Sequence, residues 1–236
     1  MGTRILNMEG IGAVTFTRRK GSRRISLRVK PDGTVLVNHP WFAASNDVLG
    51  FVAEHAGWIL EQKEKMAGRK IRYQLDEMVQ IKNTTIKISR SGVNKLEAGV
   101  SPGLVVVAVP VNLPVESDEV QHFIRGVVTL VCRKEAKKYL PERTRQLAQS
   151  NGFSFHKVFV KNLKSKWGSC SSQQNINLNL SLMLMPDHLI DYIILHELAH
   201  LREPNHGPGF WALLNQLTEN KAKALDREIR KNYHIL

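Results

Sequence analysis

The sequence predicts an α+β fold, with a β-rich N-terminal region that carries one long helix and a helical C-terminal domain that carries a small sheet. In residues 14–38, apolar side chains alternate with polar ones at a period of two, which is typical of half-buried strands, and residues 71–109 contain further strand-like runs separated by glycine and proline. In residues 45–68 and in most of the C-terminal half, apolar side chains recur every three or four positions, which is typical of amphipathic helices. We expect two domains, residues 1–112 and residues 113–236.

The N-terminal region starts with three expected strands and a helix. Val14–Phe16 and Ile25–Val29 alternate, and a third strand, Thr34–Asn38, follows a turn that contains Asp32-Gly33, a strong hairpin signal. We expect these strands to form a small antiparallel sheet. Helical spacing then begins behind a polar cap and predicts one helix over Ser45–Gly68.

The middle of the chain returns to strands before a second long helix. The run Leu104–Val109 is apolar throughout, which predicts a strand buried on both faces. A helix is expected to start near Ser117–Glu119, and Pro141 ends or kinks it because proline lacks the N–H that a helix needs. No internal repeat is evident. The remaining expected elements are strands at 155–160 and 175–183 and helices at 187–202 and 208–219.

Positive charge is concentrated near the N-terminus. The chain has 34 lysine and arginine residues against 21 aspartate and glutamate residues, a net charge of +13. Residues 1–40 hold eight of these basic side chains and two acidic ones, a net charge of +6. The cluster Arg18–Arg24 has two interpretations, a patch that binds a polyanion or nucleic acid and a solvated hairpin turn with charged flanks.

The composition excludes several classes of protein. Hydrophobic residues make up 42% and charged residues 23%, which is typical of a chain that buries a core. No basic start is followed by an apolar run, and no apolar stretch approaches the roughly 20 residues that cross a bilayer. The two cysteines, Cys132 and Cys170, provide neither a disulfide framework nor a paired-cysteine zinc spacing. We expect a soluble, cytoplasmic protein with no membrane partner. The sequence does not indicate its oligomeric state.

The motif that carries chemistry is H-E-x-x-H, at the end of a predicted helix. The i, i+4 spacing places His196 and His200 on one helix face, where two neutral imidazoles can bind one zinc ion. Glu197, beside the first histidine, can take a proton from a zinc-bound water. A proline stops the helix soon afterwards, and His206 can then supply a third ligand. Three protein ligands leave a fourth position for water, which is the arrangement of a catalytic zinc site.

The third ligand has alternatives. The offsets of the three histidines match those of metzincins, but Glu203 stands where that pattern has glycine and no Met-turn follows, so the chain is not a standard metzincin. A downstream helical glutamate, Glu219 or Glu228, would instead give a site of two histidines and one glutamate. We favour His206.

Further segments match the pattern of a known family: Lys166–Ser172 (KWGSCSS), Asn175–Asn179 (NINLN), Asn205-His206, Phe210-Trp211, and upstream Arg23–Gly33 and Glu54–Ile59. With these segments and the H-E-x-x-H helix, nearly the whole chain resembles the YgjP-like metallopeptidase-domain family. The resemblance implies a zincin-like C-terminal fold related to SprT and WLM-type proteases. It also implies that His196, His200 and His206 bind one Zn²⁺ ion per chain and that Glu197 is the catalytic base. It implies no particular substrate.

Other residues are weaker candidates. The strand Asn175–Leu182 offers an edge to an extended peptide, or is an ordinary sheet strand. Cys170 fits a structural role better than that of a nucleophile or fourth ligand, and Trp167 and Trp211 are expected to pack the two sides of the site. The candidates for orienting imidazoles are Asp191 and Glu203, and those for a second oxyanion donor are Tyr192, Lys166 and Arg202.

These features predict a zinc-dependent hydrolase, foremost a metallopeptidase that acts on a peptide or protein through Glu197. One alternative is a metal-dependent hydrolase of phosphoanhydrides such as nucleotides, which the basic excess prompts but which lacks a P-loop or another Gly-rich phosphate cradle. Another is a nucleic-acid-binding module with a vestigial or structural metal site, in which Arg18–Arg24 contact phosphate.

Overall fold

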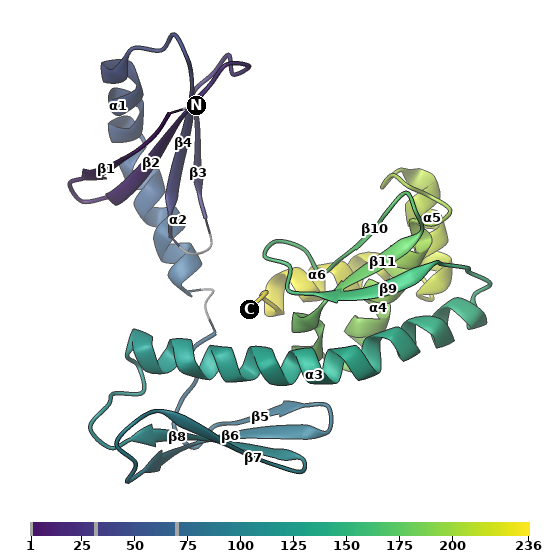
Figure 1. The fold of residues 1–236 in the computed structure, drawn as a ribbon. Coiled ribbons are helices and arrows are strands. Elements are labelled where there is room, and N and C mark those ends of the chain that lie inside the picture. The colour runs from purple at the N-terminus through teal and green to yellow at the C-terminus, as the bar shows by residue number, and fades with distance from the viewer. Residues whose placement is uncertain (1, 31–32, 69–70) are drawn as a thin grey trace. The chain divides into compact units, whose positions relative to one another are not determined.

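The computed structural model describes residues 2–30, 33–68 and 71–236. The chain forms two compact units, Met1–Ile71 and Arg72–Leu236. Both units combine sheets with helices, so the predicted α+β class is confirmed (Figure 1). Within the described ranges, no helix combines the length and the apolar character that crossing a membrane requires.

The first unit is a four-stranded sheet covered by two helices. The strand order is β1-β2-β4-β3, in which β2 and β4 are parallel and the other two pairs are antiparallel. The sheet is therefore mixed, whereas we expected it to be antiparallel. Valines such as Val14, Val35 and Val37 are fully buried. The strands are β1 (Thr3–Met8), β2 (Gly12–Arg19), β3 (Ser26–Val29) and β4 (Val35–Pro40).

The predicted turn before β4 is only partly described. The Lys30 backbone N–H donates to the Thr34 carbonyl, and Gly33 has a φ of +84°, which glycine adopts without strain. Pro31 and Asp32 of the predicted turn lie outside the described residues.

The single helix expected over residues 45–68 is two helices, α1 (Ser45–Glu54) and α2 (Ala56–Gly68). His55 interrupts them, with φ −97° and ψ 10°, and its Nδ1 hydrogen-bonds to the Phe51 carbonyl at 2.8 Å. Apolar side chains of both helices, including Val52 and Ile59, are buried against the sheet.

The second unit opens with another four-stranded sheet, of order β5-β6-β8-β7. In β8, Val105, Val107 and Val109 are buried, while Val106 and Ala108 are half-buried, so the strand buries one face fully and not both as expected. The strands are β5 (Met78–Ile81), β6 (Thr84–Ser91), β7 (Glu97–Ser101) and β8 (Leu104–Pro110).

The two four-stranded sheets form an internal repeat. Each has antiparallel outer pairs, a parallel central pair and a helix that follows the last strand. The two sequences also correspond in the last strand and at the start of the helix that follows it. VLVNHP (Val35–Pro40) corresponds to VVVAVP (Val105–Pro110), and SNDVLGFV (Ser45–Val52) corresponds to SDEVQHFI (Ser117–Ile124). Inspection of the sequence misses this repeat because the matching segments are short and the loops between them differ.

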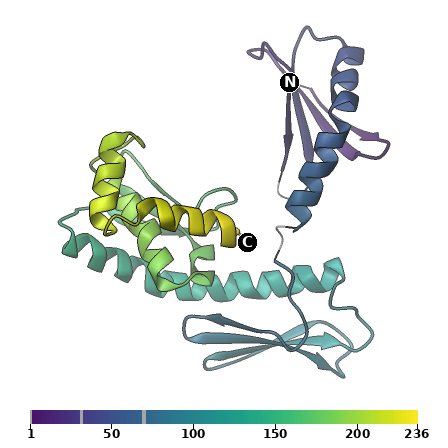
Figure 2. The same cartoon turned by 180° about the vertical axis from the view of Figure 1, so that it is seen from behind.

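The long helix α3 (Asp118–Ser150) lies in the middle of the second unit, between the β5–β8 sheet and the C-terminal elements, and packs on both (Figures 1 and 2). Ser117 caps it, as expected, by accepting a hydrogen bond from the Val120 N–H. It continues through Pro141, which removes one backbone hydrogen bond without ending the helix.

Because α3 packs on the β5–β8 sheet, that sheet belongs with the C-terminal half of the chain. Buried hydrogen bonds join them, including Thr84 Oγ1 to Glu135 Oε1 at 2.9 Å and Gln121 Nε2 to the Tyr73 carbonyl at 2.8 Å. The division of the chain accordingly falls between residues 71 and 72, which differs from the division at 112 that the sequence led us to expect.

The C-terminal elements form a three-stranded sheet and three helices around the H-E-x-x-H motif. The strand order is β10-β11-β9, with β11 in the centre. The last helix, α6, was not expected from the sequence. The elements are β9 (Lys157–Lys161), β10 (Gly168–Cys170), β11 (Asn175–Asn179), the 3-10 helix η1 (Leu180–Leu184), α4 (Asp187–Ala199), α5 (Pro208–Leu217) and α6 (Ala222–Asn232).

Candidate metal centre

Helix α4 positions the H-E-x-x-H motif inside the second unit. Pro186 precedes its first turn in an extended conformation, and the apolar side chains along the helix are buried on nearly every side. The helix ends at Ala199, earlier than the predicted residue 202, and His200 is its C-cap. The chain then turns back through Pro204 and brings His206 to the same place, just before α5.

The three predicted histidines converge on one point. A ligand nitrogen of His196, one of His200 and one of His206 all lie within 4.8 Å of one another, and His196 Nε2 is 3.0 Å from His206 Nε2. Two nitrogens bound tetrahedrally to one zinc ion, each about 2.0–2.1 Å away, would be about 3.3 Å apart. The arrangement therefore fits a single divalent metal ion.

One aromatic ring supports all three imidazoles. Phe210 of α5 is fully buried, and its ring centroid lies 4.9 Å from that of His196, 4.6 Å from His200 and 4.7 Å from His206. The Phe210 and His200 rings are stacked at 26°. Phe210 thus limits the rotation of the ligand rings. Trp211, expected at this place, lies beside His206, with ring centroids 6.4 Å apart, and packs edge-on against Phe210, with ring centroids 5.7 Å apart.

The environment of His196 and His200 favours the neutral imidazole, which is the form that binds a metal. Burial, together with the charges of His200 and His206, lowers the pKa of His196 to about 3. Burial also lowers the pKa of His200. Their nitrogen lone pairs are therefore available at neutral pH.

His200 is oriented by a backbone carbonyl. Its Nδ1 hydrogen-bonds to the Glu203 carbonyl oxygen at 3.1 Å, which leaves Nε2 to face the metal position. The Glu203 carboxyl group, a candidate for this role, lies instead against Gly209 at the start of α5. Asp191, the other candidate, accepts two hydrogen bonds from Arg143 instead, from Nε to Oδ1 at 2.7 Å and from Nη2 to Oδ2 at 2.6 Å.

Glu197 is the buried carboxyl group beside the three histidines. It is 5% exposed, and its Oε2 has no hydrogen-bond partner within residues 2–30, 33–68 and 71–236. Burial raises its pKa to about 8, although the charge of Lys166 and the backbone N–H of Cys170 oppose the shift. The carboxyl group packs so closely on β10 that a Cβ at Gly168 would lie 2.5 Å from Oε1.

The remaining candidates are placed elsewhere. Glu219 pairs with Lys221, and Glu228 hydrogen-bonds to His188, so neither joins the histidine cluster. Tyr192 is buried and has electrostatic neighbours on α6, and Lys166 lies near Glu197. Arg202 donates a hydrogen bond to the Gly152 carbonyl and stacks on the Phe153 ring. Cys170 is on β10, with its Sγ directed to the Ser171 carbonyl.

Sequence reasoning missed Phe210 as the support of the imidazoles and Gly168 as the neighbour of Glu197. Both residues were within the segments that carry the family resemblance, which was the only available signal. The predicted peptide-binding edge also differs, because β11 is the central strand of its sheet and β10 is the edge strand nearest the site.

Two imidazoles from the H-E-x-x-H motif, a third from the loop before α5 and a buried carboxyl group form a candidate site for one metal ion, of the kind that metallohydrolases have. The family comparison is more specific. Residues 23–232 match the family described as YgjP-like, metallopeptidase domain. The chain belongs to this family, as the resemblance of its motifs predicted.

Two solved structures of archaeal metallopeptidase zymogens are also similar. Jannalysin from Methanocaldococcus jannaschii is 25% identical, with a TM-score of 0.35, over 38% of this chain and 92% of that chain. Abylysin from Pyrococcus abyssi is 24% identical, with a TM-score of 0.35, over 39% of this chain and 92% of that chain. The comparison with curated proteins found no significant match.

Proposed function

We propose that this protein is a zinc-dependent peptidase in which His196, His200 and His206 hold the metal and Glu197 is the general base. The observation that supports it is the convergence of three imidazoles beside a buried carboxyl group whose Oε2 has no hydrogen-bond partner among the described residues. Membership in a metallopeptidase family supports the choice of a peptide bond as the target.

A bound zinc ion would supply Lewis acidity, which polarises a carbonyl group and lowers the pKa of water. The chain's own contribution is proton transfer. Glu197 accepts a proton from the attacking water at Oε2 and delivers it to the leaving amine. Burial raises the pKa of this carboxyl group to about 8, and a metal cation beside it would favour the charged carboxylate, which is the form that accepts the proton.

We propose that an extended peptide substrate aligns along β10. In the part of the chain that the structure describes, this short strand pairs with β11 alone, and Gly168 lies directly against Glu197. A peptide that adds to the free edge of β10 would present a backbone carbonyl to the metal centre by strand addition.

The test compares Glu197→Gln with Glu228→Gln, which removes a carboxyl group outside the centre. Purified proteins are loaded with zinc, their metal content is measured, and hydrolysis of an unfolded protein and of nucleoside triphosphates is followed with and without chelator. We expect Glu197→Gln to keep its zinc and lose at least about 100-fold in peptide turnover. Glu228→Gln should cleave like wild type.

His206→Ala completes the test of the ligand set. We expect it to lose stoichiometric zinc, because the two remaining imidazoles form an incomplete site. Full peptide turnover by zinc-loaded Glu197→Gln would disprove the role of Glu197. Chelator-sensitive hydrolysis of nucleotides without any cleavage of protein would instead support the phosphoanhydride alternative.

A further inference from the structure

The loop that joins β2 to β3 carries positive charge without local compensation. In the described part of the chain, no carboxylate lies within ion-pair distance of its basic side chains. Only Arg19 has a side-chain partner, the neutral Asn38 Oδ1 at 3.1 Å. The basic side chains, all exposed, are Arg18, Arg19, Lys20, Arg23 and Arg24.

Two large aromatic rings are exposed at the same end of this sheet. Trp41 is 60% exposed and Phe42 is 65% exposed, and their rings form a T-shaped pair with centroids 5.9 Å apart. Because β2 and β4 are parallel and Arg19 pairs with Pro40, both strands finish side by side. The basic loop therefore starts where the aromatic pair starts (Figure 1). We call Arg18–Arg24 with Trp41 and Phe42 the basic–aromatic end.

The internal repeat shows that the fold does not need these side chains. In the second sheet the corresponding loop, Gly92–Leu96, contains one basic residue, Lys95, and the residues after the last strand are Val111-Asn112. Arg90, at the register position of Arg18, is used structurally and donates to the Pro110 carbonyl. The same topology thus forms without a basic cluster or an aromatic pair, so the formation of the sheet does not account for these side chains.

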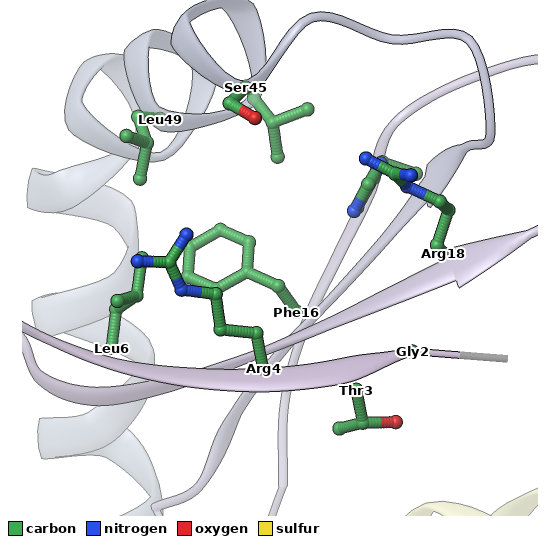
Figure 3. A pocket seen from close by; sticks show the side chains of 10 residues that line it. Gly2, Thr3, Arg4, Leu6, Phe16, Arg18, Ser45 and Leu49 are labelled. Atoms are coloured by element: carbon green, nitrogen blue, oxygen red, sulfur yellow. The ribbon is translucent and has the colours of Figure 1, made fainter.

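A cavity adjoins the basic–aromatic end on the helical side of the sheet. Its volume is 280 Å³. Phe16 and Leu49 contribute apolar walls, and Arg4 and Arg18 contribute cationic groups. Figure 3 shows the Arg4 guanidinium and the Phe16 ring below Ser45 and Leu49 of α1. Apolar walls beside guanidinium groups suit a flat ring that is linked to an anion.

We propose that the basic–aromatic end and this cavity bind single-stranded nucleic acid. Exposed aromatic rings stack on bases irrespective of sequence, and guanidinium and ammonium groups contact the phosphates. A duplex is disfavoured because its bases are already stacked on one another. An anionic membrane would also attract arginine and tryptophan side chains. A membrane surface is flat, however, and a single nucleotide unit suits a cavity with apolar walls and a cationic rim better than a flat surface does.

The experiment measures fluorescence anisotropy of a labelled oligothymidylate of about 20 nucleotides with the full-length protein over a salt series. If five basic side chains each contact a phosphate, log K should fall with log salt concentration with a slope of about −3.5. Trp41→Ala and Phe42→Ala should each weaken binding about fivefold or more. Arg18→Gln/Lys20→Gln should reduce the slope by about 1.4.

The matched control is Lys223→Gln/Arg227→Gln, which removes the same charge from exposed positions of α6. It should bind within about twofold of wild type, and all variants should retain wild-type metal content and circular dichroism. Absent or salt-insensitive binding, equal losses in the control, or tighter binding to a duplex would each overturn the proposal. Binding to phosphatidylserine vesicles without binding to the oligonucleotide would assign the surface to membranes.

Discussion

Gly168 matters at the residue scale because the side chain it lacks would occupy the place of the Glu197 carboxyl group. A Cβ there would lie 2.5 Å from Oε1 and 2.8 Å from Cδ of Glu197, both inside normal contact distance. Gly168 does not have a positive φ, so its backbone conformation is one that alanine can also adopt. Close approach alone accounts for glycine at this position.

We predict that Gly168→Ala lowers peptide turnover about 10- to 100-fold at unchanged zinc content, because the carboxyl group is displaced while the imidazoles are not. The control is Gly126→Ala in α3, where a Cβ meets nothing within 4 Å and alanine should stabilise the helix by about 0.5–1 kcal/mol. Turnover and bound zinc are measured together. Unchanged turnover in Gly168→Ala would show that Glu197 tolerates the shift.

At the scale of elements, a charged pair contributes to the contact between α3 and α4. Arg143 of α3 donates two hydrogen bonds to Asp191 of α4, and the two side chains are 34% and 22% exposed. Asp191 precedes His196 by little more than one helical turn, so this pair fixes the rotation of the helix that carries the metal ligands.

We predict that Arg143→Met lowers the free energy of unfolding by about 1–2 kcal/mol, because Asp191 is left half-buried without a partner. Arg145→Met is the matched control. Arg145 pairs with Glu142, both side chains are more than half exposed, and the expected change is below about 0.5 kcal/mol. Urea unfolding of both variants measures the difference, and equal losses would contradict a special role for the α3–α4 pair.

Local patterns predicted those elements whose structure depends on neighbours in the chain. The i, i+4 spacing of His196 and His200 and the cap at Ser117 are examples, and the structure shows both. The parallel pairing of β2 with β4 and the burial of Phe210 beneath the imidazoles depend on residues far apart in sequence, which no local pattern encodes. Of the two outcomes expected at Pro141, the end of the helix does not occur, because tertiary packing of α3 outweighs one lost hydrogen bond.

At the scale of the whole molecule, every part of the metal centre lies in the second unit. The three histidines, Glu197, Phe210 and Gly168 all follow Arg72. The first unit has its own core of buried apolar residues. Metal binding and the basic–aromatic end are thus assigned to different units of one chain.

We predict that a fragment of residues 72–236 binds one zinc ion per chain with an affinity within about threefold of the full-length protein, and no longer binds the oligothymidylate. Calorimetric titration with zinc and anisotropy measure the two properties. The same fragment with His206→Ala is the control and should not bind zinc stoichiometrically. Loss of zinc binding in the fragment itself would show that the second unit needs the first to form its centre.

The repeated sheet also bears on how this chain could have arisen. A duplicated gene segment starts with two copies under the same selection. In the second unit the helix after the repeated sheet, α3, is packed on both sides, by the β5–β8 sheet and by the C-terminal elements, so packing constrains substitutions along it. In the first unit Arg18–Arg24, Trp41 and Phe42 are outside the core, so packing constrains substitutions there much less.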